Sequence, residues 1–242
     1  MATPDVTPFP VPLPVGAETT SEQLLKLLTF LSPAFPVGGF SCSHGVEWLI
    51  DSGAIRTADG LAAWIADLLE LGSGWNDAVL FAAAHRAAEA GDSEALGSIA
   101  ELAEALAPSC ERHAETTGQG RAFLEAVSAA WPSEPVSHLM AEGGAAYPVA
   151  VGAAAAGNAI PLGAALAAYL NAFVANLVSV GVRLIPIGQN AGLKVVAALH
   201  PLVAETMERA LRSTLDDLGS AAVLSDIASM RHETQYSRVF RT

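Results

Sequence analysis

The chain has 242 residues, of which 52% are hydrophobic and 15% are charged, so it is long and apolar enough to bury a sizeable core. This composition excludes a chain that is disordered throughout. The chain has 12 Lys and Arg residues but 25 Asp and Glu residues, which gives a formal charge of -13. This charge argues against a nucleic-acid partner because it would repel a phosphate backbone. The two cysteines, Cys42 and Cys110, form no CxxC motif and are too few for a disulfide framework, so we expect a cytoplasmic protein.

Three segments are expected along the chain. Residues 1–18 carry prolines at positions 4, 8, 10, 12 and 14, which prevent a helix, and they lack the basic and apolar regions of a signal peptide. We therefore predict a Pro-rich disordered arm over 1–18, an all-helical domain over 19–228, and a C-terminal partner-docking tail over 229–242.

Apolar residues recur with helical spacing through nearly all of the remaining chain, and no segment shows sustained alternation of strand type. Capping residues, glycines and prolines divide this pattern into about ten helices. The predicted starts are near Thr20, Ser43, Ala58, Asn76, Ser93, Ser109, Pro132, Pro148, Pro161, Gly188 and Pro201. The sequence thus predicts an all-α fold, a single irregular bundle with no sheet.

A membrane-spanning alternative comes from residues 145–182, which contain no Asp, Glu, Lys or Arg. Alanine and glycine dominate this stretch, and prolines and asparagines interrupt it, so a buried pair of helices is favoured over a transmembrane hairpin. A small helical membrane transporter that uses residues 145–182 stays the alternative function.

The loop 38–45, with the sequence GGFSCSHG, is the most unusual in the chain. Ser41 and His44 could form a nucleophile and its base, which makes a hydrolase a further hypothesis, but the GxSxG pattern of a nucleophile elbow is absent. Cys42 and His44 could both reach a metal, yet two ligands alone make a weak site. His44, Glu47 and Asp51 share one helical face, for which the simplest interpretation is a solvated surface.

Two further features are polar groups at the edges of apolar segments. Arg183 ends the uncharged stretch, where it either neutralises the helix dipole or reaches a partner carboxylate. Gln189 stands at the entry of the next helix, where local hydrogen bonding is its simpler role. The last twelve residues hold three arginines and the aromatic residues Tyr236 and Phe240, a composition typical of an interface.

Three runs of residues together resemble the UreF family of urease accessory proteins. They are PVGGFSCSHGVEW over 36–48, RLIPIGQ over 183–189 and SMRHETQYSRVFRT over 229–242. The runs occur in the family's order, and the resemblance covers about residues 24–242. It implies a scaffold or chaperone without catalytic residues that supports GTP-dependent nickel insertion into apo-urease.

The resemblance also implies partners and their contact residues. The chain is expected to be a homodimer that bridges UreD (also called UreH) and the GTPase UreG and docks on apo-urease, with nickel and GTP carried by UreG and neither cofactor nor metal bound by this chain. No membrane or nucleic-acid partner is expected. Ser41, Glu47, Arg183 and Gln189 are implied to face UreG, and Arg231, Tyr236 and Arg238 lie in a tail that orders when UreD binds.

Overall fold

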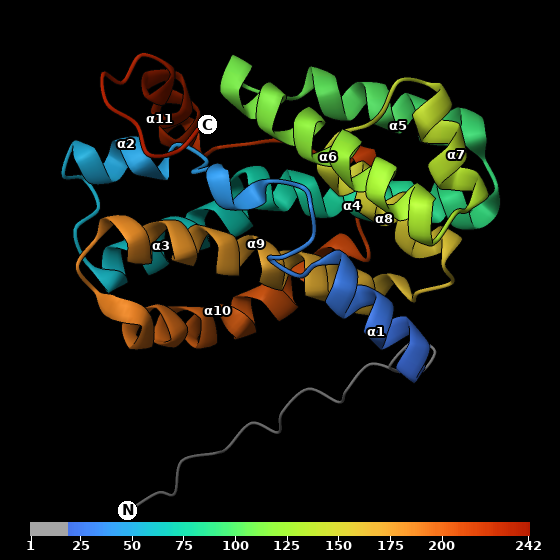
Figure 1. Ribbon diagram of the computed structural model, residues 1–242, viewed down its shortest axis with the longest axis horizontal. Helices are drawn as coiled ribbons and strands as arrows, with labels where there is room; N and C mark the ends of the chain where they lie inside the picture. Colours follow the sequence, from blue (N-terminus) through green and yellow to red (C-terminus); the bar gives the residue numbers. More distant parts are fainter. Residues whose placement is uncertain (1–18) are drawn as a thin grey trace, which may run out of the picture.

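The computed structural model describes residues 19–242, so the Pro-rich arm predicted over 1–18 lies outside the described residues (Figure 1). Over 19–242 the chain forms eleven α-helices and two short 3-10 turns, and no strand occurs in this range. The predicted fold class, one irregular helical bundle, is confirmed. In chain order the elements are α1 (Ser21–Phe30), η1 (Gly39–Ser41), α2 (Val46–Asp51), α3 (Ala58–Leu71), α4 (Ser73–Ala90), α5 (Ser93–Ala105), α6 (Cys110–Ala130), α7 (Glu134–Ala141), α8 (Tyr147–Gly157), α9 (Leu162–Leu184), α10 (Gly188–Ala210), η2 (Leu215–Asp217) and α11 (Val223–Glu233).

Local capping explains where several helices begin. Thr20 and Gln23 form a capping box at the start of α1, and the side chain of Ser109 accepts a hydrogen bond from the backbone of Arg112 at the start of α6. Thr57 caps α3 in the same way, through the N–H of Gly60. These side chains satisfy backbone N–H groups that have no partner within the helix.

The predicted helix boundary at Pro201 is wrong, because α10 continues through this residue to Ala210. A proline inside a helix removes one backbone hydrogen bond and costs about 3 kcal/mol. The buried residues Val195, Leu199 and Val203 lie on both sides of Pro201, and α10 packs against α9 and α3. Continuous burial of this face therefore outweighs the local cost.

Helix α8 lies at the centre of the fold, between α4 and α6 (Figure 1). Every residue from Pro148 to Ala155 is buried. A Cβ placed on Gly152 would stand 2.6 Å from the backbone oxygen of Phe81 in α4, so only glycine allows the two helices to approach this closely. The alanine and glycine content of this segment thus serves helix packing.

This arrangement argues against the transmembrane hairpin. Helix α8 has 11 residues, whereas a spanning helix needs about 20. Within residues 19–242, α9 is the one helix whose length and apolar composition would suffice, and half of its most apolar window is buried inside the fold. Buried core helices have the same composition.

Helix α2, helix α11 and the C-terminus gather at one end of the bundle (Figure 1). The residues after α11 return to the loop that precedes α2, and Arg241 donates its backbone N–H to the carbonyl of Ser41 (2.8 Å). The domain boundary predicted between residues 228 and 229 falls within α11. The tail thus continues from a helix of the bundle and packs against its own chain.

Candidate functional site: the C-terminal tail and its anchor

The approach of α11 to the loop before α2 depends on Gly45. This residue has a φ of 77°, in the left-handed region, and a Cβ added to it would stand 2.8 Å from the backbone nitrogen of Ser229 in α11. At the end of the tail, Ser43 donates its backbone N–H to the carbonyl of Thr242. Both α11 and the end of the tail therefore pack against the glycine-rich loop.

Glu47 of α2 is the central anchor of the tail. Its buried carboxylate accepts the backbone N–H groups of Val239 (2.6 Å) and Phe240 (2.9 Å), and its Oε2 lies 3.0 Å from Nε2 of His232. Burial by itself raises the pKa of Glu47, but the hydrogen bonds from these three residues outweigh it and lower the pKa below the ordinary value. Glu47 is thus held as a carboxylate.

A second carboxylate completes this anchor. Glu111 of α6 places Oε2 2.7 Å from Nδ1 of His232, and its Oε1 accepts a hydrogen bond from Nη1 of Arg238 (2.7 Å). His232 is fully buried between Glu47 and Glu111. We call Glu47, Glu111, His232 and Arg238 the tail anchor; its members come from α2, α6, α11 and the tail.

Arg183, at the end of α9, holds the other side of the tail. Its Nη2 donates to the carbonyl of Phe40 (2.8 Å), and its guanidinium carbon stands 4.2 Å from the centre of the Phe240 ring. Its Nε also donates to the backbone carbonyl of Ser179 in the last turns of α9 (3.3 Å), as expected for a cation that offsets the helix dipole. Of the predicted site residues, Arg183 and Glu47 therefore both contact the tail.

Ser41 and Gln189 occupy different positions. Ser41 is half-buried, and its hydroxyl donates to the carbonyl of Gly38 (2.7 Å). Gln189 is exposed in the first turn of α10. The solvated face predicted for residues 44, 47 and 51 is wrong for the first two. His44 is buried in contact with α4 and α6, and Glu47 is buried in contact with α11 and the tail, whereas Asp51 is exposed.

The hydrolase hypothesis is also wrong in its choice of residues. The ring of His44 contacts Ser73 Oγ through Nε2 (2.6 Å) and Glu115 Oε1 through Nδ1 (3.2 Å), and Ser41 bonds elsewhere. Ser73, His44 and Glu115 are linked in the order of a Ser–His–acid catalytic triad. However, the Glu115 oxygen that contacts His44 also forms an ion pair with Nη1 of Arg112 (2.6 Å). We interpret these contacts as the packing that holds His44 at its unusual φ of 58°.

The two-ligand metal site considered for the loop does not form a cluster. Cys42 is buried, and burial raises the pKa of its thiol. In the part of the chain that the structure describes, no group of three His, Cys, Asp or Glu side chains is placed to hold a metal ion.

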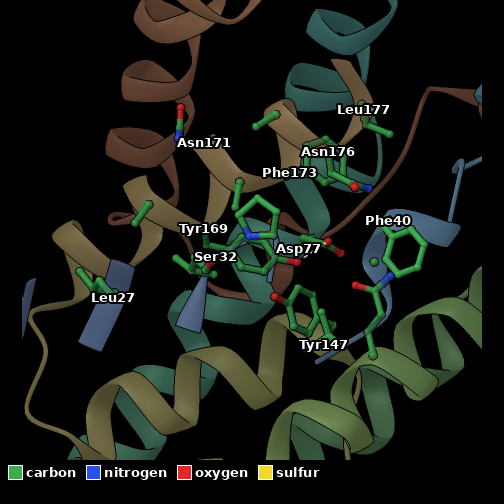
Figure 2. Close-up of a pocket in the computed structure, with 18 of the residues that line it drawn as sticks. Leu27, Ser32, Phe40, Asp77, Tyr147, Tyr169, Asn171, Phe173, Asn176 and Leu177 are labelled. Atoms are coloured by element: carbon green, nitrogen blue, oxygen red, sulfur yellow. Dashed lines mark hydrogen bonds between the residues drawn. The ribbon is translucent and has the colours of Figure 1, made fainter. Parts of the chain in front are cut away.

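A cavity of about 630 Å³ opens beside this region, between α1, the loop 31–44, α6 and α9 (Figure 2). Its lining combines apolar side chains such as Leu27 and Phe173 with several polar side chains. Among these, Asp77 accepts a hydrogen bond from the hydroxyl of Tyr169 (2.8 Å), and burial raises the pKa of Asp77 to about 6. Phe40 also lines the cavity, so the cavity adjoins the contact made by Arg183.

The comparisons with known proteins now decide the family. A model described as UreF matches residues 55–200. A protein named urease accessory protein UreF from Rhodopseudomonas palustris strain HaA2 is 48% identical over 241 residues, which cover 99% of this chain and 100% of the relative. The chain belongs to the UreF family. Proteins of the same name from Mesorhizobium japonicum (52% identical; 93% of this chain and 99% of the relative) and Methylorubrum populi (50%; 90% and 98%) agree.

The family resemblance stated from the three sequence runs is therefore confirmed. The relatives' name is that of an accessory protein rather than an enzyme, so membership in the UreF family ties this chain to urease maturation. The family model ends at residue 200, whereas the similarity to the relative from strain HaA2 continues over nearly the whole chain.

This UreF-family chain exposes an apolar strip on the outer face of α11. Tyr236 is fully exposed, and Arg231 and Arg238 are also exposed beside the strip. The exposed apolar side chains of this surface are Val223, Leu224, Ile227, Met230 and Val239. We call this set, with Tyr236, the α11–tail surface; single exposed apolar residues are ordinary, but several in one short segment indicate a contact area.

Sequence reasoning missed the α6 carboxylates that hold the tail. Glu111 and Glu115 lie four residues apart and therefore share one face of α6. Both are buried, with Glu111 against His232 and Glu115 against His44 and the hydroxyl of Thr242. Their spacing was a visible signal, but nothing in the sequence indicated which distant residues they would contact.

Proposed function

We propose that this chain is a scaffold, or chaperone, for GTP-dependent nickel insertion into apo-urease, and that it bridges UreD (UreH) and the GTPase UreG. Membership in a family of urease accessory proteins supports the process. The observation that carries the bridging role is the α11–tail surface, which is apolar outside and ordered from within by the tail anchor.

UreD is proposed to bind the α11–tail surface. Tyr236 and Met230 supply exposed apolar area, and Arg231 and Arg238 supply cations beside it, a composition enriched at protein interfaces. The tail anchor fixes the backbone at Val239 and Phe240, which lowers the entropy lost when a partner binds.

UreG is proposed to bind near Ser41, Arg183 and Gln189. Arg183 is exposed and touches both the loop at Phe40 and the tail at Phe240, so it can transmit the state of the tail to this face. Glu47 acts there indirectly, because its carboxylate is buried beneath the tail. We therefore propose conformational control of UreG rather than an arginine that reaches the GTP phosphates.

The remaining proposals concern assembly. Leu24, Leu25 and Leu28 of α1 are exposed, and Leu24 and Leu28 line the cavity together with small side chains of α9. This apolar face supports a homodimer in which a second copy binds to it. Nickel and GTP are proposed to stay with UreG, and the complex to act in the cytoplasm on apo-urease, without a membrane or nucleic-acid partner.

Co-expression with UreD and UreG tests the bridge. A stoichiometric complex is expected in size-exclusion chromatography with light scattering. Leu224→Asp and Tyr236→Ser should remove UreD. Met140→Asp should not, because this exposed apolar residue belongs to α7, a helix far from α11 in Figure 1. The proposal would be contradicted if the wild-type chain bound neither partner, or if both α11–tail variants still formed the complex with UreD.

The UreG face is tested by urease activation. Arg183→Ala and Glu47→Ala should keep the helical circular dichroism and reduce urease activation or the accuracy of nickel loading. Normal activation by either variant would remove that residue from the proposed functional surface.

A further inference from the structure

The ring of His232 has a carboxylate oxygen at each of its two nitrogens. Nε2 lies 3.0 Å from Glu47 and Nδ1 lies 2.7 Å from Glu111, and the histidine side chain is fully buried. Both partners in these contacts are side-chain carboxylate oxygens. The protonation state of the His232 ring therefore decides whether each of the two contacts is a hydrogen bond.

A neutral imidazole carries one N–H and one lone pair, whereas a protonated imidazole donates from both nitrogens. With Glu47 and Glu111 ionised, a neutral ring would direct its lone pair at a carboxylate oxygen about 3 Å away, which is repulsive. When both carboxylates are ionised, a proton on each ring nitrogen turns both short contacts into charge-assisted hydrogen bonds.

The surrounding charges favour the same state. Glu47 faces the ring from α2, Glu111 faces it from α6, and Arg238 of the tail contacts the other oxygen of Glu111. The next charged pair along α6, Arg112 and Glu115, is engaged with itself and with His44. With a protonated ring, two carboxylates meet two cations; with a neutral ring, one buried negative charge lacks compensation.

We propose that His232 is a proton-controlled latch for the C-terminal tail. When both ring nitrogens are protonated, the ring aligns the two carboxylates so that Glu47 receives the N–H groups of Val239 and Phe240, and Glu111 receives Arg238. When the ring loses one proton to solvent, the lone pair of that nitrogen repels the neighbouring carboxylate, and residues 234–242 are released. This latch deepens the proposed function, since tail release would remove part of the α11–tail surface.

The experiment uses the full chain without any partner. Nitrogen NMR of the His232 ring reports which nitrogens carry protons, and hydrogen exchange, corrected for the intrinsic effect of pH, reports the protection of the Val239 and Phe240 amides. Both are followed from about pH 5 to about pH 10. We expect a doubly protonated ring while the tail is docked, and a loss of amide protection of roughly 10- to 100-fold in step with loss of the ring proton.

Variants separate the latch from general destabilisation. His232→Gln, which bears no titratable proton, should show low tail protection without the pH step and should keep protection in α8 at the centre of the bundle. His200→Gln, at an exposed histidine of α10, should behave like the wild type. A neutral ring with a docked tail, a ring proton retained throughout, or protection that does not follow the ring would each overturn the latch.

These outcomes are independent of the bridging role. A tail indifferent to His232 protonation in the isolated chain would remove the latch and leave UreD binding to be judged by co-expression. A chain whose tail follows the ring proton but never binds UreD would remove the bridge and leave the latch.

Discussion

Replacing Glu47 with glutamine should loosen the tail without unfolding the bundle. Glutamine has nearly the same shape but keeps one acceptor oxygen, and its NH2 group would oppose either the N–H of Val239 or the donors of Phe240 and His232. A hydrogen bond to a charged group contributes about 1.5–3 kcal/mol. With one such bond lost and one donor opposed, the docked tail should lose about 2–3 kcal/mol, or roughly a 30- to 150-fold change in the open population.

Trypsin cleavage after Arg238 measures this directly, because the bond must leave the surface before the protease can bind it. The rate of the mass-resolved cleavage should rise roughly 30- to 150-fold in Glu47→Gln. Asp51→Asn, at an exposed acid one turn further along α2, should cleave at the wild-type rate. Equal rates for Glu47→Gln and wild type, or a matching loss of global stability, would show that Glu47 does not anchor the tail separately from the bundle.

Three further predictions concern the core, the cavity and the tail contact. Gly152→Ala should lower the free energy of unfolding by about 1–3 kcal/mol, because its Cβ would stand 2.6 Å from the backbone oxygen of Phe81. Gly97→Ala, whose Cβ would have its nearest neighbour at 3.8 Å, should be neutral or stabilising. Similar thermal unfolding of the two variants would refute the close approach of α8 and α4. The pKa of Asp77 is raised to about 6 from an ordinary 3.8, so its stabilising contribution is complete below about pH 4 and is lost as the pH rises through about 6. Asp77→Asn should remove this slope in urea unfolding at several pH values, and an unchanged slope would mean that Asp77 is not its source. Arg183→Gln should increase tail cleavage by less than tenfold, since an exposed cation–π contact contributes about 0.5–1 kcal/mol, and an increase equal to that of Glu47→Gln would contradict this ranking.

Much of the fold followed from local patterns in the sequence. Helical periodicity and residues such as Thr20, Thr57 and Ser109 marked most helices, because capping and amphipathic spacing act within a few residues. The start of α4 lies at Ser73 rather than near Asn76, and α10 passes through Pro201. At Pro201, the packing of α10 against α9 and α3 overrides the local signal.

The candidate site was only partly predictable. The sequence by itself marked Glu47, Arg183 and the tail as unusual, and it determined an all-helical chain with an aromatic, basic end. Only the tertiary structure decided that Glu47 is buried and that it meets His232, 185 residues further along the chain. Which distant carboxylate, imidazole and backbone N–H groups meet depends on the packing of α2, α6 and α11 around one buried volume, and no local pattern encodes that meeting.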